Sequence, residues 1–234
     1  MYKPTITWAA AKARNPVIAQ PVVKPEDRGL TGSRDIILST GKVLEQFPVG
    51  KFDVVYLDPP WQYGDTLECG NRGAKHKYDT MSMQELLEMP VPDLLHRDSI
   101  VAMWITTPFM QDAMLLASLW GLEEITRGFL WVKRNKTNNL PFKGLGHWTR
   151  GNPEDCYFFR PKGSKFKPQD VPDELIQDRL REHSRKPDVA RKRLEWISGN
   201  AQPHRIELFS RENREGWEAW GNQVGKFDKE PEAV

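Results

Sequence analysis

Runs of apolar residues, separated by polar and proline-rich stretches, divide the chain into alternating strand and helix patterns. The clearest strand patterns are residues 51–57 (KFDVVYL) and 100–106 (IVAMWIT), where β-branched and aromatic residues fill short segments between turn residues. Weaker strand patterns occupy residues 35–38, 124–133, 155–160 and 204–209.

Three helices are predicted between these strands. Ser82 and Glu85 have the spacing of a capping box, so a helix should begin there and end before Pro90 and Pro92. Pro108 can occupy the first turn of a second helix that runs to residue 120, with Gly121 placed to terminate it. Residues 187–197 form the third helix pattern.

Strands that alternate with helices predict a three-layer α/β domain, with a mostly parallel sheet and helices on both faces. We expect this domain to occupy residues 33–224, with a basic loop insertion near 134–150. Residues 1–32, which contain four prolines, predict an irregular N-terminal arm, and residues 225–234 a flexible tail. Ligands of open α/β sheets bind beyond the carboxyl ends of the strands, so the residues after each apolar run are the candidates for a site.

Composition narrows the class of protein. No run of about 20 apolar residues is present and the N-terminus lacks the apolar core of a secretory signal, so we expect neither a membrane nor a secreted protein. Two cysteines, Cys69 and Cys156, are too few for a disulfide framework or a four-ligand metal site, and no metal is expected. These features predict a cytoplasmic protein.

Charge is segregated along the chain although the formal net charge is only +2. Residues 127–167 carry a net charge of +8 and residues 181–193 a net charge of +4, which leaves −10 for the remainder. Each basic stretch alone is typical of a solvated loop or helix. Together, and interleaved with aromatic residues, they favour a nucleic acid, because aromatic rings stack on bases while Lys and Arg contact phosphates. The aromatic and His residues concerned are Phe129, Trp131, Phe142, His147, Trp148, Tyr157 and Phe158.

The tetrapeptide Asp58-Pro59-Pro60-Trp61 follows the strand pattern 51–57 directly. It is compatible with a simple strand end and proline turn in which Trp61 packs in the core. It is equally suited to methylation of an exocyclic amino group, which is a poor nucleophile because its lone pair is delocalised into the ring. A carboxylate and a backbone carbonyl can accept its two N–H groups and direct the lone pair at an electrophile. Consecutive prolines stiffen the turn and should keep the first carbonyl free of local donors, while the indole offers a stacking face.

Several further motifs follow in a fixed order. They are Tyr78-Asp79-Thr80-Met81-Ser82, Met103-Trp104-Ile105-Thr106, Trp131-Val132-Lys133, Gly146-His147-Trp148, residues 183–188 (HSRKPD), residues 206–211 (IELFSR) and residues 216–223 (GWEAWGNQ). With the DPPW tetrapeptide, this ordered set resembles the DPPW-type adenine-N6 methyltransferases. That family includes the catalytic subunit of the eukaryotic mRNA adenosine methyltransferase and bacterial and phage relatives, and the resemblance covers residues 33–224.

The resemblance implies a circularly permuted Rossmann-like methyltransferase that uses S-adenosylmethionine. This agrees with the absence of a G-x-G-x-x-G segment after the first strand pattern. By the family's pattern, Asp58, Pro59, Pro60 and Trp61 are the catalytic residues. The cofactor-binding positions implied are Asp35, Ile36, Asp58, Lys186, Glu207, Arg211, Asn213, Asn222 and Gln223.

The resemblance also implies adenine in DNA as substrate, either unpaired or flipped from the helix, with a short or relaxed sequence preference. RNA is the alternative substrate, and an inactive nucleic-acid-binding partner subunit is a further alternative. Family members often work in pairs, so a homodimer or heterodimer is expected, in the cytoplasm of a bacterial or phage-infected cell. The expected substrate-binding residues are Tyr78, Lys133, Arg134, Lys136, Lys143 and His147.

Each assigned residue has an ordinary structural alternative. Lys186 can open a surface helix, Glu207 can face outward from a strand, and Arg211 and Asn222 can be turn residues. Trp217, Trp220 and Cys156 are more typical of core packing, and His147 of a hydrogen-bonded loop. Substrate selection is expected in residues 134–145 and 162–181, which the resemblance constrains least.

Overall fold

A computed structural model of the 234-residue chain describes residues 20–62, 79–144, 146, 148–182, 185–199 and 203–228. Its strands are β1 Gly29–Ile37, β2 Val43–Leu57, β3 Leu95–Ile105, β4 Leu122–Arg134, β5 Glu154–Pro161, β6 Leu175–Arg179, β7 Arg205–Leu208 and β8 Glu218–Trp220. Its helices are α2 Met83–Glu88, α3 Met110–Leu119 and α4 Asp188–Ser198, with short 3-10 turns η1 Pro25–Asp27, η3 Val91–Leu94 and η4 Thr107–Phe109.

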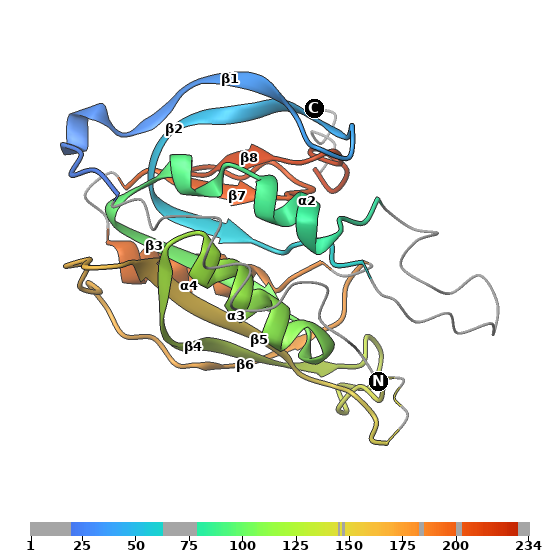
Figure 1. Cartoon of the computed structure of the whole chain (residues 1–234). Coiled ribbons are helices and arrows are strands. Elements are labelled where there is room, and N and C mark those ends of the chain that lie inside the picture. Colours follow the sequence, from blue (N-terminus) through green and yellow to red (C-terminus); the bar gives the residue numbers. More distant parts are fainter. Residues whose placement is uncertain are drawn as a thin grey trace, which may run out of the picture.

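One sheet organises the molecule, in the order β6-β4-β5-β3-β2-β7-β8 (Figure 1). Strand β2 pairs in parallel with both β3 and β7. Strand β4 also pairs in parallel with β6, and β7 with β8. Strand β5 is antiparallel to both β3 and β4, so the other six strands on this path share one direction. The expectation of a mostly parallel Rossmann-like sheet is confirmed.

Helices cover both faces of this sheet because alternate residues of each strand point to opposite sides. On one face Val55 and Leu57 pack in a core with α2 and α3, and on the other Val54 and Tyr56 pack with α4 (Figure 1). Both sets are almost completely buried, which explains why β2 and β3 have continuous rather than alternating apolar patterns. Within the described ranges, no helix is long and apolar enough to cross a membrane.

The start and stop signals of the helices act as expected. The Ser82 side chain accepts a hydrogen bond from the Glu85 backbone, and the Glu85 side chain accepts one from the Ser82 backbone, which completes the capping box of α2. Pro108 lies in η4 immediately before α3, and Gly121, with φ +79°, ends that helix. Helix α4 lies within one residue of its expected ends.

Two strands escape sequence-based prediction, and three others, β1, β2 and β3, begin at least five residues earlier than expected. Strand β6 is an edge strand with a single buried position, Ile176, and β8 has only three residues, so neither presents an apolar run. Strand β1 begins at Gly29, inside the expected irregular arm, because it pairs antiparallel with the first half of β2. The exposed side chains of β1 give no apolar signal for this pairing.

The C-terminal segment is also more ordered than expected as far as residue 228. The Phe227 N–H donates to the Arg211 carbonyl at 3.0 Å, and the Asp228 carboxylate accepts two hydrogen bonds of 2.7 Å from Asn213. Residues 225–228 are therefore not a free tail. The division into arm, domain and tail otherwise stays a prediction.

Candidate active site

A cavity of about 780 Å³ opens at the carboxyl ends of β2 and β7. The chain leaves β2 through α2 toward β3 on one side, and returns through α4 to β7 on the other side. Adjacent strands whose connections leave in opposite directions form a crevice, which is where open α/β sheets bind ligands. The described lining residues include four of the β2 segment (Val43, Leu44, Glu45, Gln46), the whole Asp58-Pro59-Pro60-Trp61 turn, and Met81, Lys186, Phe209, Arg211, Asn222 and Gln223.

The double-proline turn is fixed by backbone hydrogen bonds. The Trp61 N–H donates to the Pro59 carbonyl at 2.9 Å, and the Met81 N–H donates to the Pro60 carbonyl at 2.8 Å. The expectation that the Pro59 carbonyl is free of local donors is therefore wrong. Because a carbonyl oxygen has two lone pairs, it can still accept a second hydrogen bond from a ligand.

The Trp61 side chain is too deeply buried to stack on a substrate base with a freely exposed ring. Its side chain is 6% exposed, and its ring stacks on Phe109 with a centroid distance of 5.4 Å and an interplanar angle of 12°. It borders the cavity, but one of its faces is already occupied. Trp61 therefore forms part of the wall beside Asp58.

A chain of ion pairs, here called the cavity floor, runs from Asp58 and Lys186, which line the cavity, to Glu154 and Lys133 beyond them. Lys186 Nζ lies 2.7 Å from Asp58 Oδ2 and 3.0 Å from Glu154 Oε2, and Lys133 Nζ bonds the other oxygen of Glu154 at 2.5 Å. The Lys186 side chain is only 7% exposed, whereas that of Asp58 is 32% exposed and faces the cavity. Lys186 also lies over the Trp104 ring, 5.6 Å from its centroid. Asp58 is thus the more exposed of the two members of the chain that line the cavity.

The same contacts set the protonation of these groups. Burial and the nearby Glu154 carboxylate raise the pKa of Asp58, although Lys186 and Arg211 oppose the change. Burial also acts against the ionisation of Glu154, but Lys186 and Lys133 hold its pKa at about 2. Burial disfavours a charged Lys186, yet Asp58 and Glu154 together raise its pKa well above the usual value. The floor therefore carries an ionised Glu154 and a charged Lys186 beside a carboxylate whose pKa is raised.

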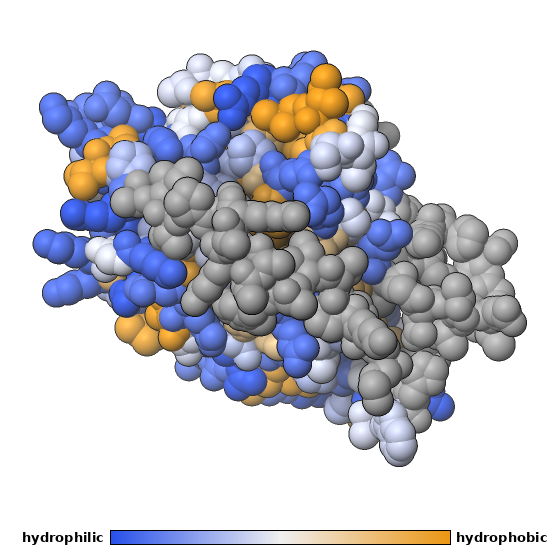
Figure 2. All heavy atoms as spheres, viewed as in Figure 1, coloured by the Kyte–Doolittle hydropathy of each residue, from blue (hydrophilic) through white to orange (hydrophobic). Residues whose placement is uncertain are grey.

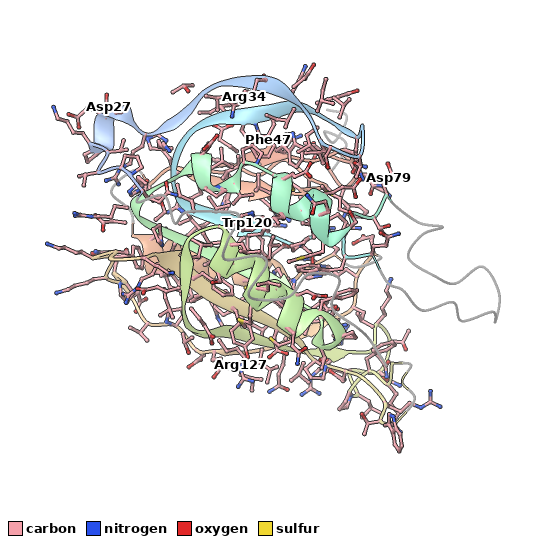
Figure 3. All side chains as sticks on the ribbon, in the orientation of Figure 1. Asp27, Arg34, Phe47, Asp79, Trp120 and Arg127 are labelled. Atoms are coloured by element: carbon pink, nitrogen blue, oxygen red, sulfur yellow. The ribbon has the colours of Figure 1, made fainter. Side chains whose placement is uncertain are left out.

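The rim of the cavity joins segments that are far apart in sequence. Asn222 donates to Asp79 at 3.5 Å, and Lys42 donates to the Thr80 carbonyl at 3.0 Å. Asp79 lies at the end of the segment that leads into α2 (Figure 3). On the opposite wall, the Arg211 guanidinium lies over the Phe227 ring at 5.0 Å. Polar groups from the β1–β2 ribbon, the α2 approach and the C-terminal segment thus converge on one opening.

Of the expected cofactor positions, the structure brings together Asp58, Lys186, Arg211, Asn222 and Gln223, all of which line the cavity. Asp35 and Ile36 are not among the described residues that do. They lie on β1, where the exposed Asp35 accepts the Gln46 N–H at 2.8 Å, so their pairing partners on β2 line the cavity in their place. The cofactor role of Asp35 and Ile36 stays a prediction, while Leu44 and Gln46 on the neighbouring strand line the cavity.

Glu207 and Asn213 are also placed elsewhere. Glu207 lies on β7 under α4, where its carboxylate is 3.3 Å from Arg191 Nε. The Asn213 side chain donates to Asp228. Neither is among the described residues that line the cavity, and their cofactor roles stay a prediction.

The expected substrate-binding residues fall into three groups. Lys133 pairs with Glu154, and Arg134 binds the Asn139 carbonyl and the Gln177 side chain, so both brace the protein instead of facing a ligand. Lys136 and Lys143 are exposed on the loop between β4 and β5. Tyr78 and His147 lie outside the described residues.

Sequence reasoning missed Glu154 as a site residue. It is one of only two acidic residues in the basic segment 127–167, and an acidic residue at the start of a buried strand pattern is a signal for a partner charge. The backbone segment 43–46 and Phe209 carried no such signal. Among the described residues, no group of three or more His, Cys, Asp or Glu is arranged to hold a metal ion.

A mostly parallel sheet with a cavity at its switch point, floored by an aspartate on a double-proline turn, defines the class of Rossmann-like methyltransferases. The sequence model of the MT-A70 family matches residues 52–223, and the chain belongs to this family. It is therefore an enzyme of the N6-adenine methyltransferase class.

Individual relatives differ in how much of their length the chain covers. The Type II methyltransferase M.MunI of Mycoplasma sp is 32% identical over 209 residues, which cover 78% of this chain and 82% of that protein. The N(6)-adenosine-methyltransferase catalytic subunit METTL3 of Homo sapiens is 30% identical over 183 residues, which cover 75% of this chain but 29% of that protein. The N(6)-adenosine-methyltransferase MT-A70-like of Arabidopsis thaliana is 31% identical over 179 residues, which cover 75% of this chain and 24% of that protein. The chain thus spans most of the first relative and less than a third of the other two.

Proposed function

We propose that this chain transfers a methyl group from S-adenosylmethionine to the N6 amino group of adenine in DNA. The observation that carries the proposal is the Asp58 carboxylate, which faces a large cavity while Lys186 holds it from behind at 2.7 Å. An acceptor fixed in this way can hold an amino group in one orientation, and most of the rate of methyl transfer comes from such positioning.

The residues around the cavity fit this cofactor. Its volume of about 780 Å³ lies within the range of small-molecule sites and leaves room for a base beside the cofactor. Arg211, Asn222 and Gln223 supply donors for hydroxyl and carboxylate oxygens, and Leu44 and Phe209 supply apolar surface for a purine ring. When bound, S-adenosylmethionine supplies an electrophilic methyl group on a sulfonium.

Asp58 and the second lone pair of the Pro59 carbonyl accept the two N–H groups of the adenine amine. This arrangement would make the nitrogen pyramidal and direct its lone pair at the electrophilic methyl group that the bound cofactor would supply. The amine then loses one proton, and the raised pKa of Asp58 favours its transfer to that carboxylate. Because Asp58 lies at the bottom of a cavity, the adenine must leave its base stack to reach it.

Two observations support a nucleic acid, and DNA ahead of RNA. The exposed Lys136 and Lys143 lie on a loop that rises from the same sheet edge as the cavity, where they can contact phosphates. The relative that the chain covers over most of its length is a type II methyltransferase, whereas those named for N(6)-adenosine methylation are covered over less than a third.

The decisive experiment incubates the purified chain with methyl-labelled cofactor and matched DNA and RNA oligonucleotides, followed by nucleoside mass spectrometry. The expected product is N6-methyladenine from DNA. Transfer to RNA alone would replace the substrate, and absence of transfer to either by the chain alone would favour the inactive partner subunit. Light scattering of the active species tests the proposed pairing with a second subunit.

Calorimetry tests the cofactor role of Lys186 separately. In Lys186→Ala, Asp58 and Glu154 lose their shared cation and the cavity loses a donor, so cofactor affinity should fall. Unchanged affinity would remove Lys186 from the proposed cofactor site and leave it with the positioning of Asp58 alone.

A further inference from the structure

Trp148 is the most exposed large hydrophobic side chain in the described part of the chain, at 99%. It lies in the loop between β4 and β5, in the basic segment where aromatic residues led us to expect a nucleic acid. Most other aromatic residues of that segment belong to the core, since Phe129 and Trp131 are 1% exposed and Phe158 is 7% exposed. Of the aromatic residues in this basic segment that the structure describes, Trp148 is therefore the one whose ring is fully exposed to a ligand.

The loop that carries Trp148 is braced by its own hydrogen bonds. The Asn152 side chain donates to the carbonyls of Lys133 and Phe142 and accepts the Lys133 N–H, and the Gly144 N–H donates to the Gly151 carbonyl at 2.7 Å. A Cβ at Gly146 would collide with the Thr149 carbonyl oxygen, so the two arms of the turn approach each other closely there. Trp148 thus lies in a hairpin-like loop that is held by its own hydrogen bonds. Figure 1 shows this loop projecting beyond the end of β4 and the start of β5.

The base of this loop is joined to the reactive carboxylate. Lys133 and Glu154, at its two ends, pair with each other, and Glu154 pairs through Lys186 with Asp58. The carboxyl ends of β2 and β4 also lie at the same edge of the sheet, because both strands run in one direction. A ligand that occupies the cavity and extends along this edge would therefore meet the loop.

The exposed basic and aromatic side chains of the loop indicate what kind of ligand it binds. Exposed Lys136, Lys143 and Arg150 lie on the same loop as the indole and complement a polyanion. A fully exposed indole is unfavourable in water, and an aromatic ring amid cations is the arrangement that stacks on nucleobases while the cations contact phosphates. Figure 2 shows the described atoms of the visible face as mostly hydrophilic with separate apolar patches.

We propose that Trp148 stacks on a DNA base that neighbours the target adenine and so holds the strand open beside the cavity. The inference rests on the proposed function. It assigns to this chain a base-contacting residue outside the cavity, which fixes the strand while Asp58 holds the amine.

The experiment compares three single variants: Trp148→Ala, Trp148→Phe and Trp196→Ala. Because the Trp148 side chain is fully exposed, its removal should leave the fold intact, which melting curves check. Trp196 is the matched control, since it is a partly exposed tryptophan (43%) beside Lys192 on α4, away from the loop. DNA affinity is measured by fluorescence anisotropy at fixed salt, with an oligonucleotide that the native chain methylates.

Loss of one base stack should weaken DNA binding of Trp148→Ala about tenfold. Trp148→Phe should retain most of the affinity, Trp196→Ala should match the native chain, and cofactor affinity should not change in any variant. With 2-aminopurine next to the target adenine, native protein should quench its fluorescence and Trp148→Ala should not. Native DNA affinity and native quenching in Trp148→Ala would overturn the inference.

Failure of this inference is distinguishable from failure of the proposed function. If the native chain methylates DNA and Trp148→Ala binds DNA equally well, only the stacking role is lost. If the native chain methylates neither DNA nor RNA, the proposed function fails, and anisotropy with unmodified DNA still measures the contribution of Trp148 to binding.

Discussion

Two buried glutamates of this chain have opposite protonation behaviour although both lie beside basic side chains. Glu154, on the cavity floor, has a pKa of about 2, whereas burial raises the pKa of Glu207, under α4, to about 7. Their side chains are 14% and 15% exposed, so the amount of burial does not explain the difference.

The number of cations in direct contact with each carboxylate explains it. Each oxygen of Glu154 has its own ammonium group, from Lys133 and Lys186. Glu207 shares a single guanidinium with Glu212, and Arg191 directs two of its nitrogens to Glu212 while its Nε lies 3.3 Å from Glu207. A carboxylate with two cations of its own thus keeps a low pKa, whereas one that shares its single guanidinium does not, although Arg185 and Arg214 also pair with Glu212 in the same cluster.

Substitution of Asp58 should have the largest effect. Asp58→Ala removes the only carboxylate of the floor that faces the cavity in the described structure, so methyl transfer should fall at least about a thousandfold. Cofactor binding should remain measurable by calorimetry, because the lining residues of the C-terminal segment are unchanged. Near-native turnover in this variant would show that the cavity floor is a structural ion cluster, like the one under α4.

Substitution in the ion cluster under α4, formed by Arg191, Glu207 and Glu212, should lower the stability of the protein and leave its activity unchanged. Arg191→Met leaves Glu207 and Glu212 buried without their shared cation, and should lower the free energy of unfolding by about 3 kcal/mol. Denaturant unfolding measures this loss, and turnover per folded molecule at low temperature should stay close to that of the native chain. A large loss of turnover in folded protein would mean that the two regions are coupled.

Glu154→Gln tests the cavity floor without removing a group that the ligand contacts. Lys186 would then be held by Asp58 alone, and loss of this positioning should lower kcat about 30-fold with little change in KM. Because Glu154 helps to raise the pKa of Asp58, the acid limb of the kcat–pH profile should move to lower pH in the variant. A lowered kcat with an unmoved acid limb would leave Glu154 with a purely structural role.

The smallest expected effect concerns the pH dependence of stability. With a pKa of about 7 in the folded state against 4.5 when unfolded, Glu207 binds more protons in the folded state, so it lowers stability as pH rises from 4.5 to 7. The groups that face it are Arg191, Glu212, Asp58 and Arg214. Glu207→Gln cannot ionise, so relative to the native chain it should gain on the order of 1 to 2 kcal/mol between pH 5 and pH 8.

Glu154 supplies the matched comparison, because its pKa is lowered from 4.5 to about 2. Its contribution to stability is present above pH 4.5 and is lost as pH falls toward 2, the reverse of the Glu207 dependence. Thermal melts of Glu154→Gln and Glu207→Gln across pH 3 to 8 should therefore diverge from the native curve in opposite directions. Parallel curves would contradict the assignment of opposite shifts.

The elements that position the site could be predicted because their signals are local. The apolar run of 51–57, the capping box of Ser82 and the stop at Gly121 act within a few residues, and each appears in the structure. Strand β6 and the pairing of β1 with β2 could not be predicted, because their residues are mostly exposed and depend on a neighbouring strand for their conformation.

By itself, the amino-acid sequence determined the α/β layering and the motif residues that meet at the cavity, because apolar periodicity and turn chemistry are properties of neighbouring positions. Only the tertiary structure decided how charges are shared. It joined Lys186 to both Asp58 and Glu154, turned Glu207 toward Arg191, and put the backbone of 43–46 at the cavity in place of Asp35 and Ile36. Coulombic pairing depends on distances between residues more than a hundred positions apart, as for Asp58 and Lys186, and no local pattern records those distances.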